Sequence, residues 1–315
     1  MEPELFAVAE RERQTRAAAH RRRAADALDR QYEAFPRLRE LDNKLRSARI
    51  AAVAQGFLSP PEAGDPDAEA VAAERLAFIR SAGITPASDT PYCELCGDAG
   101  AREGAPCECL KALYAPLQRD VLKRDIDIDA ICFGNFDIGL FRAEKLETER
   151  YAPRELIARA RDAAAEFAEN FGEHSESLFI NGNVGTGKTF LAACILGAVA
   201  NRAFWTEYIP AGRFIQAAEA NQFSREQQDG RDFRRFARCD LLVLDDLGTE
   251  YLSPFAQSAL FDLINTRLQR RKSTIVTSNL ISAQLSERYL PQTASRLGGE
   301  FVPIYLFGDD LRERM

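Results

Sequence analysis

The 315 residues, of which 46% are apolar, suffice for two domains and a sizeable core. A net charge of -7 excludes a basic field over the whole surface, so contact with nucleic acid requires a local cluster of Lys and Arg. The acidic start of the chain lacks the basic and apolar parts of a secretory signal. The longest apolar run, from Phe190 to Ala200, is too short to cross a bilayer about 30 Å thick. We therefore expect a soluble, cytoplasmic protein without a membrane partner.

Residues 1 to about 58 are rich in Ala, Arg, Glu and Leu, which is the composition of helices. Apolar residues recur at helical spacing across an interruption at Pro36. They are Leu28, Tyr32, Phe35, Leu38, Leu41 and Leu45. This stripe either binds a partner or packs a small core of its own. A linker dense in Pro and Gly follows at 59–66, and a further helix is expected over about 68–82.

Four of the seven cysteines form the pattern C-x2-C-x10-C-x-C, and they are Cys93, Cys96, Cys107 and Cys109. Paired thiolates separated by a loop suit tetrahedral Zn²⁺, and metal binding worth about 10–16 kcal/mol in small zinc modules could hold this segment folded. Two disulfides or unrelated buried cysteines are the alternatives. The other three, Cys132, Cys194 and Cys239, are expected to be ordinary buried small residues.

An apolar and aromatic segment at 126–141 precedes the first expected strand. Such a segment can fold over an adenine ring, with Phe133, Phe136 and Ile138 as the candidates, or its side chains can serve the core alone. Residues 147–170 then predict a helix with Pro153 near its start.

A strand-like run at 178–182 breaks into a glycine-rich loop that ends in Lys-Thr and precedes an apolar helix. The loop matches G-x-x-x-x-G-K-[ST] in full, and its flanks are those of a phosphate-binding loop. Backbone N–H groups and the helix N-terminus would face phosphate oxygens, Lys188 would reach the β and γ phosphates, and Thr189 would bind Mg²⁺. The predicted nucleotide-binding residues are Gly182, Asn183, Val184, Gly185, Thr186, Gly187, Lys188 and Thr189.

A second strand is expected at 204–209, where β-forming residues alternate before Pro210. Arginines and phenylalanines are interleaved between it and Cys239; they are Arg213, Arg225, Arg231, Arg234, Arg235 and Arg238, with Phe214, Phe223, Phe233 and Phe236. Such a mixture can bind single-stranded nucleic acid by phosphate contact and base stacking. Alternatively, the phenylalanines belong to the core and the arginines to a solvated face.

Four consecutive apolar residues at 241–244 indicate a strand buried on both faces, as in a parallel sheet. Asp245 and Asp246 follow at its carboxyl end, where ligands bind in open α/β sheets. We assign Asp245 to Mg²⁺ and Asp246 to orienting or deprotonating the attacking water. A helix at 253–271 leads to another buried strand, after which Asn279 could touch the γ-phosphate or hold that water.

These motifs, in this order, resemble AAA+ ATPases, and most closely the DnaC/DnaI-type replicative helicase loaders with their IstB-like relatives. The zinc segment of DnaI-like loaders is similar to the run from Cys93 to Cys109, and a segment before their ATPase core is similar to Phe133-Gly-Asn-Phe136-Asp. The resemblance covers residue 90 to the end. It implies a RecA-like α/β core with a parallel five-stranded sheet in the order 5-1-4-3-2, preceded by a helical and zinc-binding region. Residues 1 to about 80 lie outside the resemblance. The expected domains are a helical partner-binding region at 1–90, a zinc-binding segment with a connecting helix at 91–125, and an AAA+ ATPase domain at 126–315.

The resemblance also implies roles for single residues. Asn279 would be sensor 1, and Arg296 would be an arginine finger that acts on a neighbouring subunit, with Arg288 as its nearest competitor. Arg312 would be a sensor 2-like contact, although a leucine precedes it where the family has an aromatic residue. Asp246 replaces the Glu of fast AAA+ motors, which favours slow hydrolysis used as a switch. The few residues after the terminal arginines leave no room for a helical lid domain.

The resulting hypothesis is an ATPase, with ATP, Mg²⁺ and Zn²⁺ as cofactors, that associates with itself through ATP, binds a replicative DNA helicase hexamer and places it on single-stranded DNA. One alternative is an IstB-like transposition helper that acts on target DNA with a transposase. Another is an interaction protein in which nucleotide is only structural.

Overall fold

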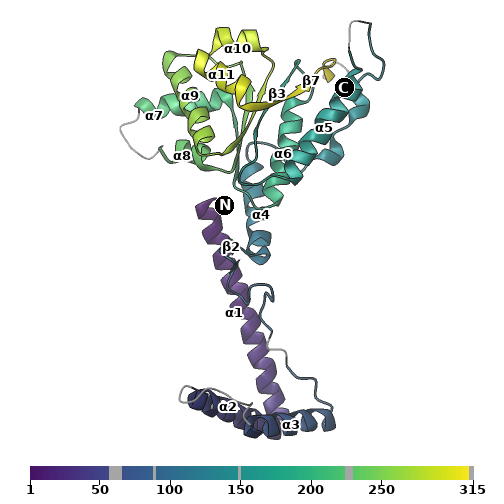
Figure 1. Ribbon diagram of the computed structural model, residues 1–315, viewed down its shortest axis with the longest axis vertical. Helices are drawn as coiled ribbons and strands as arrows, with labels where there is room; N and C mark the ends of the chain where they lie inside the picture. Colours follow the sequence, from purple (N-terminus) through teal and green to yellow (C-terminus); the bar gives the residue numbers. More distant parts are fainter. Residues whose placement is uncertain (57–65, 88–89, 148–149, 224–229, 312–315) are drawn as a thin grey trace. The chain divides into compact units, whose positions relative to one another are not determined.

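The structure, a computed structural model, describes residues 1–56, 66–87, 90–147, 150–223 and 230–311 (Figure 1). Its internal contacts divide the chain into two compact units. The first, which we call the sheet unit, comprises Met1–Ala9 and Leu110–Met315, and the second, the helical unit, comprises Glu10–Cys109. Residues of helix α1 (Pro3–Ala34) are divided between them.

The helical unit consists mainly of α1 residues from Glu10 onward, α2 (Pro36–Gly56) and α3 (Pro66–Ser81), with a short antiparallel pair, β1 (Ala101–Arg102) and β2 (Ala105–Pro106). The predicted break at Pro36 is confirmed. Proline begins α2 because the first N–H groups of a helix have no partner within it. A small core holds these helices together; its members are Leu38, Ile79 and Ile84, with Tyr32, Phe35, Phe78 and Ala82 packed against them.

The apolar stripe predicted across α1 and α2 serves two purposes. Leu38 and Leu41 are buried, with exposures of 1% and 0%. Leu28 and Leu45, at the two ends of the stripe, remain partly exposed and line a cavity. The stripe therefore contributes both to a core and to an accessible surface.

The sheet unit contains five strands, which are β3 (Ser177–Gly182), β4 (Thr206–Pro210), β5 (Leu241–Leu247), β6 (Ser273–Ser278) and β7 (Phe301–Leu306). Their order in the sheet is β4-β5-β6-β3-β7, and every neighbouring pair is parallel. With the five strands numbered in chain order, this is the predicted order 5-1-4-3-2, which is confirmed. Every residue of β3 and β6 is buried, as in the interior of a parallel sheet.

Helices cover both faces of this sheet (Figure 1). One face packs against α5 (Pro153–Glu169) and α6 (Lys188–Asn201) through a core that includes Ile180, Val243 and Ile304. The other face contributes Phe179 and Leu244 to a second core. The helices around that second core are α7 (Ala211–Phe223), α8 (Gly230–Arg238), α9 (Pro254–Gln269), α10 (Ser282–Arg288) and α11 (Pro291–Gly299). The carboxyl ends of the parallel strands consequently share one edge, where side chains for a ligand can gather.

Helix α4 (Glu108–Leu122) leaves the second cysteine pair, as predicted. Within the sheet unit its residues Leu110 and Tyr114 pack against Ala9, together with Leu5 and Phe6 at the start of the chain. Two 3-10 turns, η1 (Phe133–Asn135) and η2 (Ile138–Leu140), lie in the segment between α4 and α5.

Two local predictions are wrong. The helix expected from residue 147 begins only at Pro153, because the ring fixes the first helical position and holds Ala152 before it in an extended conformation. Cys132 is exposed, because it lies in the irregular chain just before η1, whereas Cys194 and Cys239 are buried as expected.

Within the described ranges, no helix combines the length and the apolar character that a bilayer crossing requires.

Candidate functional site

The predicted phosphate loop joins the end of β3 to the start of α6. Gly187 caps α6 in the left-handed conformation, with a φ of 85° that glycine adopts without a steric penalty. Lys188 is 9% exposed, and its Nζ donates to the carbonyl oxygens of Gly182 (3.0 Å) and Asn183 (2.7 Å). The ammonium group thus lies against its own loop, where phosphate oxygens can replace these carbonyl acceptors.

The other two glycines of the loop are needed for different reasons, because the backbone of β7 lies close to Gly182, whereas Gly185 has a φ of 74°. A Cβ on Gly182 would lie 1.9 Å from the carbonyl oxygen of Leu306 in β7, and a Cβ on Gly185 would lie 1.6 Å from Oδ1 of Asp310. The N–H of Leu311 donates to the carbonyl oxygen of Gly185 at 3.2 Å. Residues that follow β7 therefore pack directly on the phosphate loop.

Asp245, at the carboxyl end of β5, lies beside the first turn of α6. Thr189 Oγ1 is 3.0 Å from both carboxylate oxygens of Asp245. Tyr208 donates its hydroxyl to Oδ2 at 2.8 Å, and Thr277 donates to Oδ1 at 2.7 Å. Burial, followed by the charge of Asp245, raises the pKa of Tyr208, so the phenol remains a donor. Thr189 and Asp245 present oxygen atoms from which Mg²⁺ can be held directly or through water.

Asp246 and Asn279 lie at the same edge of the sheet. Asp246 has a φ of 57°, a left-handed conformation uncommon outside glycine, and its N–H donates to Thr277 Oγ1 at 2.8 Å. One hydroxyl, that of Thr277, therefore holds both aspartates of the motif. Asn279 Oδ1 is buried and has no hydrogen-bond partner among the described residues. Because buried acceptors are rarely left unpaired, this oxygen is suited to a polar ligand or a water molecule.

The side chains of the phosphate loop and of the strand ends line one cavity of about 500 Å³. Its lining includes Lys188, Thr189, both aspartates and Asn279, together with Phe136 from the segment before α5. The Phe136 ring packs edge-on against Phe190, with centroids 5.6 Å apart. Of the three candidate adenine contacts, the structure brings Phe136 to the cavity. Phe133 and Ile138 pack against the core and are not among the lining residues. The volume suits a nucleotide-sized ligand.

The predicted arginines lie in different surroundings. Arg296, on α11, is 42% exposed; its Nη1 lies 3.1 Å from Glu300 Oε1, and its Nη2 donates to Asn265 Oδ1 at 3.4 Å. It is not among the residues that line the cavity of its own chain, which is compatible with the role predicted for it on a neighbouring subunit. Arg288 donates to the carbonyl oxygen of Glu250. Arg312 lies outside the described residues.

Three further residues support this site, and no role is predicted for them from the sequence. They are Tyr208, Thr277 and Glu250. Glu250 is 6% exposed, accepts the N–H of Gly248 at 2.8 Å, and accepts the hydroxyl of Tyr289. A hydroxyl residue inside a buried strand could have pointed to Thr277, because such a group needs a partner. No pattern in the sequence marks Tyr208 or Glu250.

The structure describes only some of the interleaved arginines and phenylalanines between β4 and Cys239. Phe214 and Phe236 are buried in the core, which favours the core interpretation for these two rings. Arg235 Nη2 lies 2.7 Å from Oε2 of the buried Glu207. Side chains over 221–233, which include four of the predicted residues, lie outside the description.

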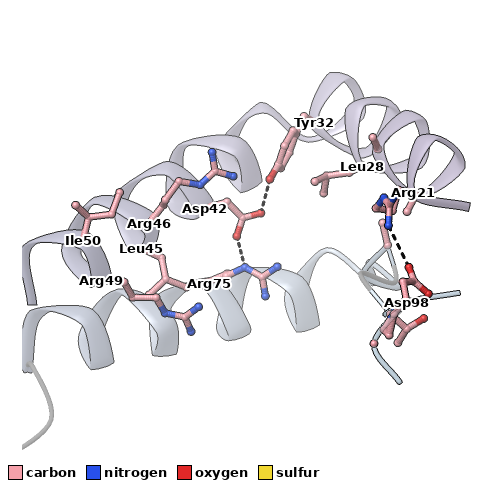
Figure 2. A pocket seen from close by; sticks show the side chains of 16 residues that line it. Arg21, Leu28, Tyr32, Asp42, Leu45, Arg46, Arg49, Ile50, Arg75 and Asp98 are labelled. Carbon is pink, nitrogen blue, oxygen red and sulfur yellow. Dashed lines mark hydrogen bonds and ion pairs between the residues drawn. The ribbon is translucent and has the colours of Figure 1, made fainter. Parts of the chain in front are cut away.

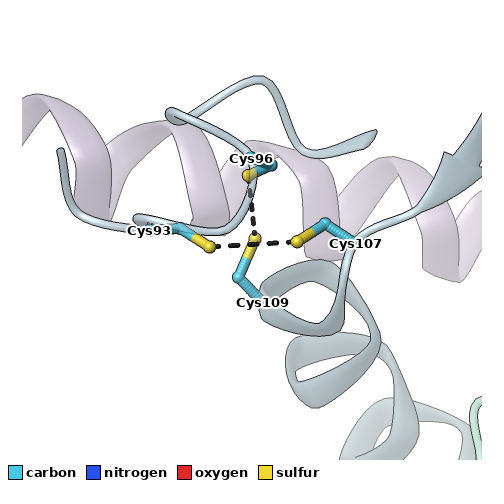
Figure 3. Close-up of side chains that lie close together, drawn as sticks. All are labelled: Cys93, Cys96, Cys107 and Cys109. Carbon is cyan, nitrogen blue, oxygen red and sulfur yellow. Dashed lines mark hydrogen bonds between the residues drawn. The ribbon is translucent and has the colours of Figure 1, made fainter. Parts of the chain in front are cut away.

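The helical unit carries the four predicted cysteines as one cluster (Figure 3). Their Sγ atoms all lie within 4.8 Å of one another, with 3.8 Å between Cys93 and Cys107 and 3.7 Å between Cys96 and Cys109. Four thiolates placed tetrahedrally at about 2.3 Å from zinc would be about 3.8 Å apart, so the cluster fits that ion. The free thiols also argue against the alternative of two disulfides.

Backbone and side-chain contacts orient the cluster. Burial opposes ionisation of Cys96, but the N–H of Gly100 and the neighbouring thiols outweigh it and lower the pKa of Cys96 to about 7. Asp98 accepts the N–H of Cys93 at 2.9 Å, and its carbonyl oxygen accepts Arg13 Nη1 at 2.5 Å. Arg13 is 5% exposed, so α1 packs closely against the cysteine loop.

The phosphate loop, the Thr189–Asp245 pair and the strand order define a P-loop nucleotide-binding domain with a RecA-like α/β fold. Residues 153–293 match the family described as IstB-like ATP binding protein, so this part of the chain is similar to an IstB-like ATP-binding domain.

Several proteins are similar to part of the chain. The chromosomal replication initiator protein DnaA of Bordetella pertussis is 32% identical over 130 residues, which are 40% of this chain and 27% of DnaA. The insertion sequence IS1162 putative ATP-binding protein of Pseudomonas fluorescens is 33% identical over 108 residues, 34% of this chain and 45% of that protein. A crystal structure of the DnaC helicase loader aligns with a TM-score of 0.46 and 23% identity, over 55% of this chain and 97% of that one. The chain thus spans less than half the length of either curated relative.

Proposed function

We propose that this protein is an ATP-dependent loader of a replicative DNA helicase. It binds the helicase hexamer and delivers it to single-stranded DNA, with ATP binding and slow hydrolysis as the switch. The observation that carries the proposal is a second compact unit, Glu10–Cys109, which lies outside the matched ATP-binding segment and joins three helices to a cysteine cluster. An ATP-binding domain alone does not need such a unit, whereas a loader needs a surface for its partner.

We assign one function to each of three consecutive parts of the chain. Residues 1–90 bind the helicase, 91–125 form the zinc segment with its connecting helix, and 126–315 form the ATPase domain. Cys93, Cys96, Cys107 and Cys109 hold a structural Zn²⁺, which supplies no chemistry to the reaction beyond fixing the loop.

In this proposal, the residues that line the cavity bind the phosphates and Mg²⁺ and activate the attacking water. Lys188 neutralises charge on the β and γ phosphates. Thr189 and Asp245 would hold Mg²⁺, which would offset further phosphate charge. Asp246 accepts a proton from the attacking water or orients it, and Asn279, whose Oδ1 is otherwise unpaired, helps to position that water. Because Asp is one methylene shorter than the usual Glu, turnover is slow.

Assembly completes the site. The proposed role of Arg296 is to stabilise transition-state charge on the ATP of a neighbouring subunit, an effect worth about 10³–10⁵ in rate where it is fully used. Its 42% exposure supports this role, because a finger in trans must be reachable from another molecule. Arg312 remains the proposed sensor 2-like contact.

A second candidate function is a transposition helper ATPase. It is favoured by the IstB-like match and by the similarity to the insertion sequence IS1162 protein. This candidate predicts binding to duplex DNA and to a transposase, and it leaves the helical unit and its cysteine cluster without a role.

Size-exclusion chromatography with light scattering tests the partner. The full-length protein is mixed with the replicative helicase of its source cell in ATP and Mg²⁺, with Lys188→Ala as the control. A complex that forms with wild type and weakens in Lys188→Ala supports the loader. Absence of a complex in every nucleotide state, combined with tight binding to duplex DNA, would favour the transposition helper.

ATP turnover separates an enzyme from a nucleotide-stabilised interaction protein. Asp246→Ala and Arg296→Ala should each abolish measurable hydrolysis and leave ATP binding intact. Mixing the two variants should restore part of the activity, because an intact Arg296 then faces an intact Asp246 in some assemblies. If both variants keep full loading activity, nucleotide has only a structural role.

A further inference from the structure

Apolar residues and arginines together line a groove in the helical unit (Figure 2). We call its aliphatic residues Leu28, Leu45 and Ile50 the floor, and its four arginines the rim. The volume of the groove is about 1080 Å³, and its lining residues come from α1, α2 and α3, from Ala87, and from the segment 90–98. Ile50 is 64% exposed, which is unusual for an isoleucine in so small a unit.

The small core of this unit does not use these apolar residues. Leu38, Ile79 and Ile84 form that core, and Leu28 and Leu45 continue the same stripe beyond it. A partner that covers the floor would remove its apolar surface from water, which stabilises a complex by about 25 cal/mol per Å² of buried area. The groove therefore favours an occupant with apolar side chains.

The charged residues that line the groove indicate what charge its occupant carries. The lining contains four arginines and two aspartates. Asp42 accepts the hydroxyl of Tyr32 at 2.9 Å and pairs with Arg75, and Asp98 lies 3.3 Å from Arg21.

Both carboxylates of the groove are therefore already neutralised by partners in the same unit. The two remaining arginines, Arg46 and Arg49, are exposed on α2 and form no ion pair within the part of the chain that the structure describes. In a protein with a net charge of -7, this excess of positive charge is a local feature. It is complementary to carboxylates that would lie along the rim.

We propose that this groove binds an acidic amphipathic helix of the helicase, with its apolar face on Leu28, Leu45 and Ile50 and its carboxylates at Arg46 and Arg49. The proposal rests on the loader function and specifies the partner's chemistry. An amphipathic helix that binds in a groove contacts it with apolar side chains at positions i, i+3, i+4 and i+7. Such an apolar face would cover the floor. A nucleic-acid strand would satisfy the arginines and leave the aliphatic floor uncovered.

Matched variants of the full-length chain test this proposal. Arg46→Glu combined with Arg49→Glu reverses the rim charge, and Ile50→Ser removes an exposed floor side chain. Arg22→Glu combined with Arg23→Glu is the control, because it makes the same charge change at exposed positions of α1 outside the groove. Circular dichroism verifies that each variant keeps the helical content of wild type.

Affinity for the purified helicase hexamer is then measured by titration in ATP and Mg²⁺. We expect the rim variant to bind at least about tenfold more weakly, Ile50→Ser about fivefold more weakly, and the control within about twofold of wild type. If both groove variants bind as tightly as wild type, the groove proposal is overturned while the loader function stands. If wild type itself does not bind the helicase, both are overturned.

A photo-crosslinking amino acid at Ile50 identifies the occupant. Mass spectrometry of the crosslinked complex should recover a helicase peptide with Asp or Glu and apolar residues at helical spacing. A basic or uncharged peptide contradicts the proposal. So does a rim variant that loses affinity for single-stranded DNA and retains its affinity for the helicase, because the groove would then be a nucleic-acid surface.

Discussion

Tyr208 donates its hydroxyl to Oδ2 of Asp245 across 2.8 Å, so a residue of β4 fixes the carboxylate that ends β5. Removing a hydrogen bond that orients a metal ligand commonly lowers metal affinity or activity by about 10–100-fold. We expect Tyr208→Phe to raise the Mg²⁺ concentration needed for half-maximal ATP turnover by about tenfold. Tyr305→Phe, at a half-exposed position of β7, is the control and should match wild type. An unchanged Mg²⁺ dependence in Tyr208→Phe would show that Asp245 does not need this partner.

Glu250 is expected to act as a positioning residue for the loop that carries Asp246. Its carboxylate accepts the N–H of Gly248, two residues after Asp246, and Gly248 has a φ of 120°. Glu250→Ala leaves that donor unpaired, so we expect ATP turnover to fall about tenfold while ATP affinity stays within about twofold. Glu250→Gln keeps an acceptor oxygen and should recover part of the rate.

The control for Glu250 is Glu287→Ala, at an exposed position of α10. Turnover and nucleotide affinity are measured separately for all three variants. A parallel loss of both in Glu250→Ala would indicate a general structural defect.

Much of the ATP site follows from local sequence. The phosphate loop and the buried strand before Asp245 are contiguous patterns, and a parallel sheet brings the ends of its strands to one edge. The supporting contacts of Tyr208 and Thr277 depend on the register that pairs β4, β5 and β6, for example Pro210 opposite Asp245. Register between segments more than 30 residues apart has no local signal in the chain. This is why the ligands were predicted and their supports were not.

The helical unit shows a different limit. The helical spacing of apolar residues identified the stripe, but it could not show which of its members are buried. Leu38 and Leu41 are buried, whereas Leu28 and Leu45 line the groove. That division depends on where α3 packs. The exposed Cys132 shows the same limit, because composition predicts burial for cysteine and the tertiary fold decides it.

Metal analysis of the purified protein should find one zinc ion per chain. Cys93→Ser should lose the ion, together with protection of residues 10–109 from proteolysis, because the small core of this unit cannot hold the cysteine loop alone. ATP affinity should stay within about twofold of wild type, since the residues lining the ATP cavity all belong to the sheet unit. Cys132→Ser, outside the cluster, is the control and should keep its zinc. A folded protein free of zinc with two disulfides would contradict the metal site.

Asp240 couples the stability of the sheet unit to pH. Its carboxylate lies 2.6 Å from Lys272 Nζ and 3.6 Å from the N-terminal amine, and it accepts the N–H of Trp205 at 3.0 Å. Burial raises the pKa of Asp240, but Lys272, the amine and the Trp205 N–H outweigh burial and hold the pKa below its usual range. A depressed carboxyl pKa stabilises the folded state above the pKa of the unfolded chain, and this stability is lost as the pH falls through the folded-state pKa.

We therefore expect Asp240→Asn to lower the free energy of unfolding by on the order of 1 kcal/mol at pH 7. The difference from wild type should begin to shrink near about pH 4 and vanish below the folded-state pKa. Trp205 is the single tryptophan of the chain, so its fluorescence during urea unfolding reports on this neighbourhood. Asp262→Asn, at an exposed position of α9, is the control. A stability difference that persists unchanged to pH 3 would mean that the charge of Asp240 contributes nothing, because only a charge effect disappears when the carboxylate is protonated.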